Sequence, residues 1–369
     1  MIPTPTPSLT TSNTAFAGLG VIEGFFGQSW TWAARHAYAT WLAEKGYNFY
    51  IYAPKADACL RRSWWQSWPE AEWQSLIRLR HHCQQAGLAF GIGLTPLGAH
   101  HDYAFHKPRL LARLAEINTR LQPDILAILF DDMPSDTPKL AELQLTIAHD
   151  IACNSVASRH IFCPSFYSTD PILEKVFGAM PVNYWSTLAK GLDNAFDLFW
   201  TGPKVCSDTY PSEHLQWVID TLGRKPFLWD NYPVNDGKKA SDYIYLRAFE
   251  HRPASLADYI RGHAINPMKQ PWLSQIPLAT LPMSYQQRDS YDAETAWQTA
   301  AHDAVGADIA ALLFADLPQF CDLGLAQLTN QQQRALQQRY VPYSAHPAVR
   351  EVLGWLAGDY RFDPACLTG

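Results

Sequence analysis

The sequence lacks the features that mark nucleic-acid binding and membrane insertion. Its 29 Lys and Arg residues are outnumbered by 35 Asp and Glu, which gives a net charge of −6, and no sustained basic run could follow a phosphate backbone. No apolar stretch is long enough to span a bilayer. Residues 1–18 contain neither the basic nor the apolar part of a signal peptide. We therefore expect neither nucleic acid nor a membrane among its partners.

Metal-binding and common catalytic motifs are also missing. The seven cysteines are scattered, odd in number and without a CxxC pair, which argues against a disulfide framework and a zinc site. No HExxH, GxSxG or P-loop motif is present. The histidine pairs at 81–82 and 100–101 are interpreted as solvated. We expect no metal, no cofactor and a cytoplasmic, reducing location.

Apolar and aromatic residues, in contrast, are abundant. Hydrophobic residues make up 47% of the chain and aromatic residues 13%, with 14 Trp, so there is material for a large core. Rings with an apolar face and a polar edge suit sugar rings. This excess gives weak support to a carbohydrate site, although core packing is the better explanation for most of the tryptophans.

Short apolar segments alternate with segments of helical periodicity through most of the chain. Strand then helix, repeated eight times, predicts a (β/α)8 TIM barrel. A doubly wound open sheet is the alternative, but the first turn, VIEGFFG, lacks the glycine pattern of a dinucleotide site. The predicted strands are 18–27, 48–55, 88–96, 124–133, 160–167, 196–203, 225–233 and 275–285.

After about residue 290 the pattern contains helices only. They are expected at 292–305, near 325–340 and at 345–356, and a short capped helix is expected earlier, at 255–262. We predict three parts: a flexible N-terminal tail at 1–15, a catalytic barrel at 16–290, and a short helical C-terminal appendage at 291–369 that packs on the barrel.

One strand end carries two adjacent acids. The segment AILFDDMPSD (127–136) is a buried apolar strand that stops at Asp131 and Asp132, and Pro134 follows. The carboxyl ends of barrel strands are where chemistry is done, although paired acids also cap helices. Strand neighbours point to opposite faces. Both acids can therefore reach one ligand only if the backbone twists there, and two carboxylates so close should have separated pKa values.

Polar and aromatic side chains stand at the other strand ends as well. Each has an ordinary structural explanation, such as packing or turn geometry. Together they supply carboxylates, a cation, a hydroxyl, an amide and aromatic faces, a set that can hold a molecule rich in hydroxyls. The set comprises Glu23, Gly24, Lys55, Cys163, Tyr167, Trp200, Thr201, Trp229, Asn231 and Asp236.

Seven segments resemble, in order, the motifs of glycoside hydrolase family 84. They are VIEGFFGQSW, YIYAPKAD, AILFDDM, FCPSFY, LFWTGPKV, LWDNYPVND and INP, running from about residue 18 to about residue 300. The family consists of retaining β-N-acetylglucosaminidases and includes the protein O-GlcNAcases. The resemblance implies a retaining exo-β-N-acetylglucosaminidase that acts through an oxazoline intermediate, and its partner would be a GlcNAc-containing glycan or glycoprotein.

The resemblance also implies a role for each matching residue. Asp132 resembles the general acid/base, and Asp131 the carboxylate that orients the 2-acetamido N–H, so we expect Asp132 to stay protonated and Asp131 ionised. Tyr167 matches the tyrosine that binds near the acetamido oxygen. The remaining matches are Cys163 and Trp229 around the acetamido methyl, and Gly24, Lys55, Asn231, Asp236 and Asn266 around the sugar ring.

The sequence departs from the family pattern around the outer pocket. Phe26 replaces the usual tyrosine, Ala56 replaces an acid, and the third strand ends in TPLGAHHD. These changes are expected to affect leaving-group specificity more than the reaction. Two alternative functions stay open at this point, a non-catalytic GlcNAc-binding barrel and an endo-acting, hyaluronidase-like hydrolase. The sequence carries no signal for oligomeric state.

Overall fold

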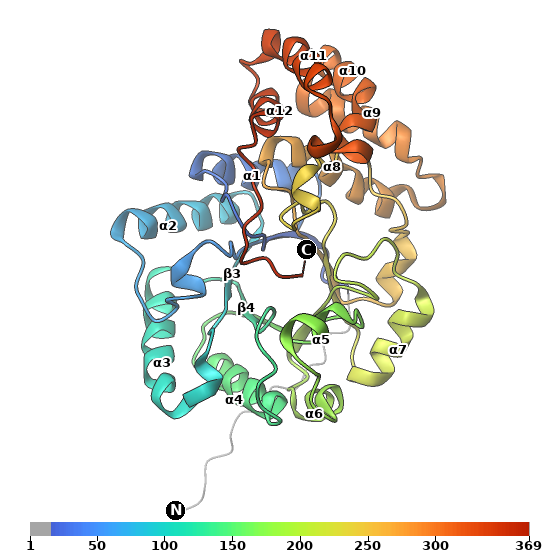
Figure 1. Ribbon diagram of the computed structural model, residues 1–369. Helices are drawn as coiled ribbons and strands as arrows, with labels where there is room; N and C mark the ends of the chain where they lie inside the picture. Colours follow the sequence, from blue (N-terminus) through green and yellow to red (C-terminus); the bar gives the residue numbers. More distant parts are fainter. Residues whose placement is uncertain (1–15, 369) are drawn as a thin grey trace, which may run out of the picture.

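Eight parallel strands form a closed barrel in the computed structural model, which describes residues 16–368. The strands follow one another around the barrel in chain order, so the predicted (β/α)8 fold is confirmed (Figure 1). The tail predicted at 1–15 lies outside the described residues. The strands are β1 (Leu19–Glu23), β2 (Phe49–Tyr52), β3 (Ala89–Leu94), β4 (Ile125–Leu129), β5 (Arg159–Cys163), β6 (Phe196–Trp200), β7 (Phe227–Asp230) and β8 (Gly262–Ile265).

Helices lie around and beside the barrel (Figure 1), and each helix from α1 to α8 contributes buried side chains to the barrel's main apolar cluster. Within residues 16–368, none of them combines the length and the apolar character needed to cross a bilayer. Their bounds are α1 (Trp32–Glu44), α2 (Glu70–Gln85), α3 (Tyr103–Arg120), α4 (Leu140–Cys153), α5 (Ile172–Phe177), α6 (Tyr184–Gly191), α7 (Ser212–Leu222), α8 (Pro271–Gln287), α9 (Ala293–Val305), α10 (Ala307–Ala315), α11 (Asn330–Tyr340) and α12 (Pro347–Ala357).

The strand register brings all the carboxyl ends to one mouth. Strand β4 is buried along its whole length and pairs with β3 and β5. The barrel closes where β1 pairs with β8, with Leu19 opposite His263. Because every strand runs in the same direction, the residues that follow each strand lie around the same opening.

The eighth strand is not where the sequence pattern places it. The segment 275–285 belongs to helix α8, and the last strand is β8, only four residues long. Helix α8 is buried on most sides and contains Pro277 and Pro282, so it lacks the polar face that reveals a surface helix. The helix expected at 255–262 is a shorter 3₁₀ turn, Ala254–Asp258.

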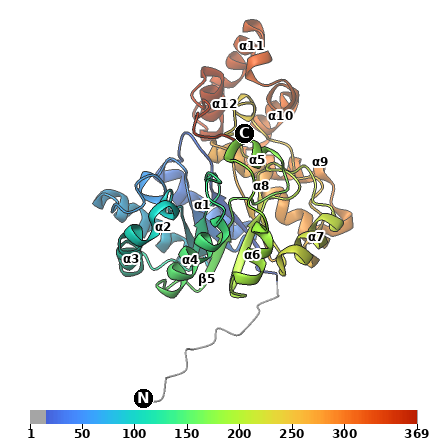
Figure 2. The ribbon, with the colours of Figure 1, turned by 60° about the horizontal axis from the view of Figure 1, so that its bottom comes forward.

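Helices α9 to α12 gather at one side of the barrel (Figure 2). With α8 they enclose a second apolar cluster that includes Trp297, Phe320 and Trp355. Helices α9, α11 and α12 lie where the periodicity predicts helices, and α10 is an addition. Because α8 contributes to both apolar clusters, the appended helices share their core with the barrel's last helix. The division at residues 290 and 291 stays a prediction.

Candidate active site

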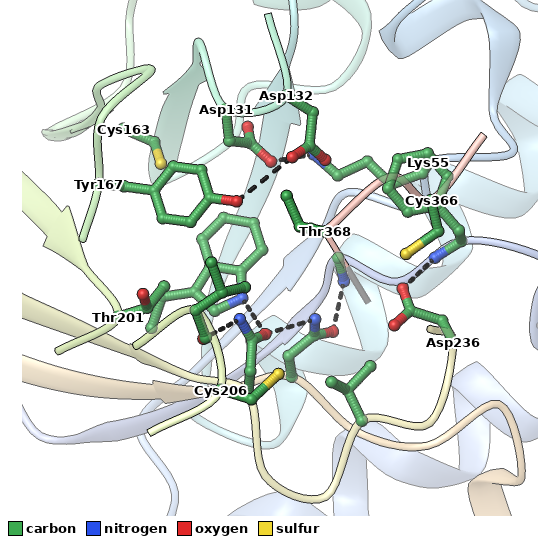
Figure 3. Close-up of a pocket in the computed structure, with 17 residues that line it drawn as sticks. Lys55, Asp131, Asp132, Cys163, Tyr167, Thr201, Cys206, Asp236, Cys366 and Thr368 are labelled. Atoms are coloured by element: carbon green, nitrogen blue, oxygen red, sulfur yellow. Dashed lines mark hydrogen bonds and ion pairs between the residues drawn. The ribbon is translucent and has the colours of Figure 1, made fainter. Parts of the chain in front are cut away.

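A pocket opens at the carboxyl ends of the strands and contains all ten residues predicted for the site (Figure 3). The free cavity between its walls has a volume of about 50 Å³. The predicted residues that line it are Gly24, Lys55, Asp131, Asp132, Cys163, Tyr167, Trp229, Asn231, Asp236 and Asn266. They come from the carboxyl ends of strands β5 and β7 and from the loops after β1, β2, β4, β5, β7 and β8, so the fold brings together side chains that are far apart in the sequence.

The backbone twists where the two adjacent acids leave strand β4. Asp132 has a φ of +57°, in the left-handed region that aspartate tolerates better than most residues. This conformation turns the chain out of the strand, and both carboxylates line the same pocket. The predicted twist is therefore confirmed. Backbone of this kind is typical of functional sites.

Asp131 is buried and pairs with a buried cation. Its Oδ2 atom forms an ion pair with the Lys55 ammonium, and both side chains are less than a tenth exposed. The Lys55 ammonium also lies 5.7 Å from the ring centre of Trp229. Among the described residues, Asp131 Oδ1 is buried and has no hydrogen-bond partner. A buried acceptor without a donor is costly in free energy, so this atom is suited to accept a hydrogen bond from a ligand.

Asp132 is placed to hold a proton. Burial raises its pKa to about 6, the nearby Asp131 carboxylate adds to the shift, and Lys55 opposes it. The Tyr167 hydroxyl donates to Asp132 Oδ1 over 3.3 Å. Burial, followed by the Asp132 charge, raises the pKa of Tyr167 well above its ordinary value, so this phenol is a hydrogen-bond donor at neutral pH.

A chain of amide hydrogen bonds forms the opposite wall of the pocket. The Gly24 N–H donates to Asn266 Oδ1 over 3.1 Å, and Asn266 Nδ2 donates to Asn231 Oδ1 over 3.0 Å. The Trp229 indole N–H donates to the same Asn231 oxygen over 3.0 Å. A Cβ atom at position 24 would lie 2.4 Å from the Trp229 ring. Glycine is therefore needed for the indole to reach the pocket.

Two further polar groups complete the pocket lining. The Phe26 N–H donates to Asp236 Oδ2 over 2.7 Å, and burial raises the pKa of this carboxyl. Burial also raises the pKa of the Cys163 thiol far above its ordinary value, and the Asp131 charge adds to the effect. A thiol that keeps its proton is a poor nucleophile. Cys163 therefore lines the pocket without attacking a ligand.

Two residues from the strand ends do not reach the pocket. Glu23 is fully buried and pairs with Arg35 of α1, with Nη2–Oε1 and Nε–Oε2 distances of 2.6 and 2.8 Å. Trp200 turns its indole N–H toward His214 Nε2, 3.1 Å away. Both side chains stabilise the packing between strands and helices.

The sequence predicts that both histidines of the pair at 100–101 are solvated. This prediction is wrong for His100. The His100 side chain is only 2% exposed, whereas that of His101 is 58% exposed. Their Nε2 atoms lie 3.2 and 2.6 Å from the two carboxylate oxygens of Asp136. Within residues 16–368, these three side chains are close enough to share a metal ion. Hydrogen bonding to both oxygens already accounts for the cluster, which joins the loops after β3 and β4 outside the pocket.

Several pocket residues were missing from the predicted site. Thr201, Val205, Cys206 and Val234 come from the loops after β6 and β7. Thr201 was among the strand-end residues, but the other three are small side chains in irregular loops and give no chemical signal in the sequence. Cys366 and Thr368 also line the pocket, although they follow α12 and no sequence pattern connects them to the barrel.

The arrangement can combine proton donation with recognition of an amide and several hydroxyls. Asp132 can donate a proton, and Asp131 can accept one hydrogen bond from an N–H group. Lys55, Asn231, Asn266 and Asp236 can bind hydroxyls, while Trp229 offers an apolar face.

Known proteins resemble this chain in sequence and in fold. A family model described as beta-N-acetylglucosaminidase matches residues 19–316. The Protein O-GlcNAcases of Rattus norvegicus and Mus musculus are each 26% identical over 260 residues, which is 67% of this chain. The chain spans only 28% of the length of these relatives.

A solved structure of a mutant Thermobaculum terrenum O-GlcNAc hydrolase superimposes with a TM-score of 0.76 and 25% identity. The alignment covers 94% of this chain and 81% of that protein. The family match extends over all eight strands, from β1 to β8. The chain therefore belongs to the β-N-acetylglucosaminidase family, glycoside hydrolase family 84, as the order of its motifs predicts.

Proposed function

We propose that the protein is a retaining exo-β-N-acetylglucosaminidase, which removes terminal β-linked N-acetylglucosamine through an oxazoline intermediate. One observation carries the proposal. Two adjacent carboxylates face one pocket in different electrostatic surroundings, because Asp131 is paired with Lys55 while the pKa of Asp132 is raised to about 6. Such a pair can divide the work between proton transfer and hydrogen bonding.

In the first step the substrate supplies the nucleophile. Its acetamide oxygen attacks the anomeric carbon while Asp132 donates its proton to the glycosidic oxygen, so the leaving group departs as an alcohol. Asp131 Oδ1, which has no partner among the described residues, accepts the acetamide N–H and orients it. In the second step the Asp132 carboxylate takes a proton from water, which opens the oxazoline. Two inversions give net retention without an enzyme nucleophile.

The rest of the pocket suits an N-acetyl sugar at a chain end. Cys163 and Trp229 offer an apolar lining for the acetamido methyl group, and the amides and Asp236 offer partners for the hydroxyls. The relatives named Protein O-GlcNAcase and O-GlcNAc hydrolase make GlcNAc on Ser or Thr of a protein the first candidate substrate. The free cavity is small, about 50 Å³, and a small pocket favours exo over endo action.

The test uses aryl β-N-acetylglucosaminides whose acetamide carries zero, one, two or three fluorine atoms. Fluorine weakens the acetamide oxygen as a nucleophile, so kcat/KM should fall steadily along the series. NMR of an early reaction mixture should show the β-anomer of the product first. Formation of the α-anomer, or rates indifferent to fluorination, would contradict the mechanism.

The non-catalytic alternative makes a different prediction. A binding protein should bind an N-acetylglucosamine-derived thiazoline without turning over any of the aryl glycosides. Measuring thiazoline binding by calorimetry beside the hydrolysis assay separates a binder from an enzyme, and sizing the products from a polymer separates exo from endo action.

A further inference from the structure

The last described residues return from the appended helices to the barrel mouth. Helix α12 ends at Ala357, and Gly358 caps it with a φ of +78°. Residues 359–368 then run without helix or strand to the centre of the barrel opening, as the red segment in Figure 1 shows. We call residues 359–368 the C-terminal strap.

The barrel rim holds the strap by its backbone. The Lys269 ammonium donates to the carbonyl oxygens of Tyr360 and Arg361 over 2.9 and 3.2 Å, and Lys269 is 2% exposed. Gly27, in the loop after β1, lies against the strap, since its Cβ position is 3.7 Å from the Arg361 oxygen, an ordinary contact distance. The strap then turns, because the backbone carbonyl of Asp363 accepts from the Cys366 N–H over 2.9 Å.

The end of the strap lies among the residues proposed to act on the sugar. Thr368 lines the same pocket as Asp131, Asp132 and Tyr167, and Figure 3 shows its side chain pointing into that pocket. The nearby Thr368 side chain opposes the burial that raises the pKa of the Tyr167 phenol. Thr368 also lines an adjacent, larger hollow. The strap therefore forms a wall between the sugar pocket and that hollow.

We propose that the C-terminal strap is autoinhibitory, competing with the N-acetyl sugar for the pocket, so that substrate binding requires its release. The inference rests on the proposed function. A sugar ring that contacts Asp131, Asp132 and Tyr167 must occupy the space that the Thr368 side chain fills. Release is feasible because much of the strap is exposed, including Arg361, and no regular secondary structure holds it.

The test compares the full chain with a chain that ends at Gly358, after the last turn of α12. A competing segment lowers the fraction of competent enzyme and raises the apparent dissociation constant by the same factor. The shortened chain should show a KM for a fluorogenic β-N-acetylglucosaminide lower by about 3- to 30-fold, with kcat within about twofold. An equal or higher KM overturns the inference.

A matched pair of substitutions tests the strap without shortening the chain. Thr368→Gly removes the side chain that enters the pocket and should lower KM. Leu367→Gly, which alters the neighbouring residue with a 55% exposed side chain, is the control for backbone flexibility and should leave KM nearly unchanged. Equal changes in KM for the two substitutions contradict the inference, because the Thr368 side chain would then not compete with the substrate.

Proteolysis gives a readout that does not depend on turnover. Saturating N-acetylglucosamine should speed tryptic cleavage after Arg361 in the full chain, whereas mannose, which lacks the acetamide, should not. Unchanged cleavage overturns the inference. Hydrolysis by both chains with the same KM removes the strap's role and leaves the enzyme assignment intact. Absence of hydrolysis and of sugar binding in both chains removes the proposed function and the inference with it.

Discussion

Two strand ends of the same barrel carry buried aspartates with opposite properties. Asp230, the last residue of β7, accepts hydrogen bonds at both oxygens. Arg252 Nε and Nη2 lie 2.8 and 3.1 Å away, His263 Nε2 lies 3.0 Å away, and the Tyr232 N–H donates over 3.1 Å. Burial alone would raise the pKa of Asp230, but Arg252 and His263 hold it below the ordinary value.

Of the acids after β4, Asp131 is buried and Asp132 is half-buried, and both have fewer partners than Asp230. Asp131 keeps one oxygen without a donor among the described residues, and the pKa of Asp132 is raised to about 6 by burial and by Asp131. Burial tends to raise the pKa at both strand ends, so the number of fixed hydrogen-bond donors and cations explains why the pKa of Asp230 is lowered and that of Asp132 is raised. Where donors saturate the carboxylate, it serves stability, and where they do not, it keeps the capacity to bind and to carry a proton.

Removing the proton donor should have the largest effect on activity. Asp132→Asn should lower kcat for an aryl glycoside with a poor leaving group by about 10²–10⁴-fold, the usual contribution of general acid catalysis. A dinitrophenyl glycoside needs little protonation and should lose far less. Steady-state kinetics on the two substrates check this expectation.

The matched control for that variant is Asp136→Asn. This acid lies in the same loop but does not line the pocket, so its replacement should leave kcat within about twofold on both substrates. Equal losses with good and poor leaving groups in Asp132→Asn would show that Asp132 has a role other than proton donation.

At the saturated strand end the expected loss is in stability. Asp230→Asn leaves the Arg252 guanidinium buried without its counter-ion, and breaking a buried pair in this way typically costs about 3–5 kcal/mol. Because the pKa of Asp230 is lowered in the folded state, its contribution is present above the ordinary aspartate range and is lost as pH falls below it. Urea unfolding at pH 7 and at pH 3 measures both effects, and a smaller loss at pH 7 than at pH 3 would contradict the assignment.

The contrast between the two strand ends was only partly visible in the sequence. The predicted twist at Asp131 and Asp132 is confirmed because a strand that ends in two acids before Pro134 leaves few other ways to bring both to one ligand. Asp230, in LWDNYP, was not singled out. Its partners Arg252 and His263 lie more than 20 residues away in segments without a periodic pattern, and His263 belongs to the strand that was predicted elsewhere.

The same limit explains the errors in the fold. Strand β8, GHAI, is too short to show alternation, and a buried helix such as α8 resembles a buried strand in hydropathy alone. The short helices α5 and α6 were not predicted, because six and eight residues hold too little periodicity. The strap depends on the path of the appended helices, which no local pattern encodes. The ten pocket residues were found through the order of the strand ends and the resemblance of their motifs to a family.

The pH dependence sharpens the comparison through Asp132. The Asp132 carboxyl must be protonated to act as the acid, so kcat/KM for a substrate with a poor leaving group should decline as pH rises through about 6. The Lys55 charge lowers the pKa of Asp132, so Lys55→Met should move this decline to higher pH while reducing the rate. Lys139→Met, an exposed lysine near the start of α4, is the control and should leave the profile in place. A decline that moved to lower pH in Lys55→Met would contradict the electrostatic argument.

The smallest effect is expected for an acid that is neither buried nor in the pocket. Asp322 pairs with Arg247 over 2.6 Å, and the two side chains are 55% and 49% exposed. Water solvates both charges whether or not they touch, so Asp322→Asn should change the free energy of unfolding by less than about 1 kcal/mol. High salt should remove most of this difference by screening, whereas the loss in Asp230→Asn should persist. Urea unfolding of both variants at low and high salt therefore distinguishes them. A large loss of stability in Asp322→Asn that persists at high salt would show that burial does not explain the difference in strength between the two ion pairs.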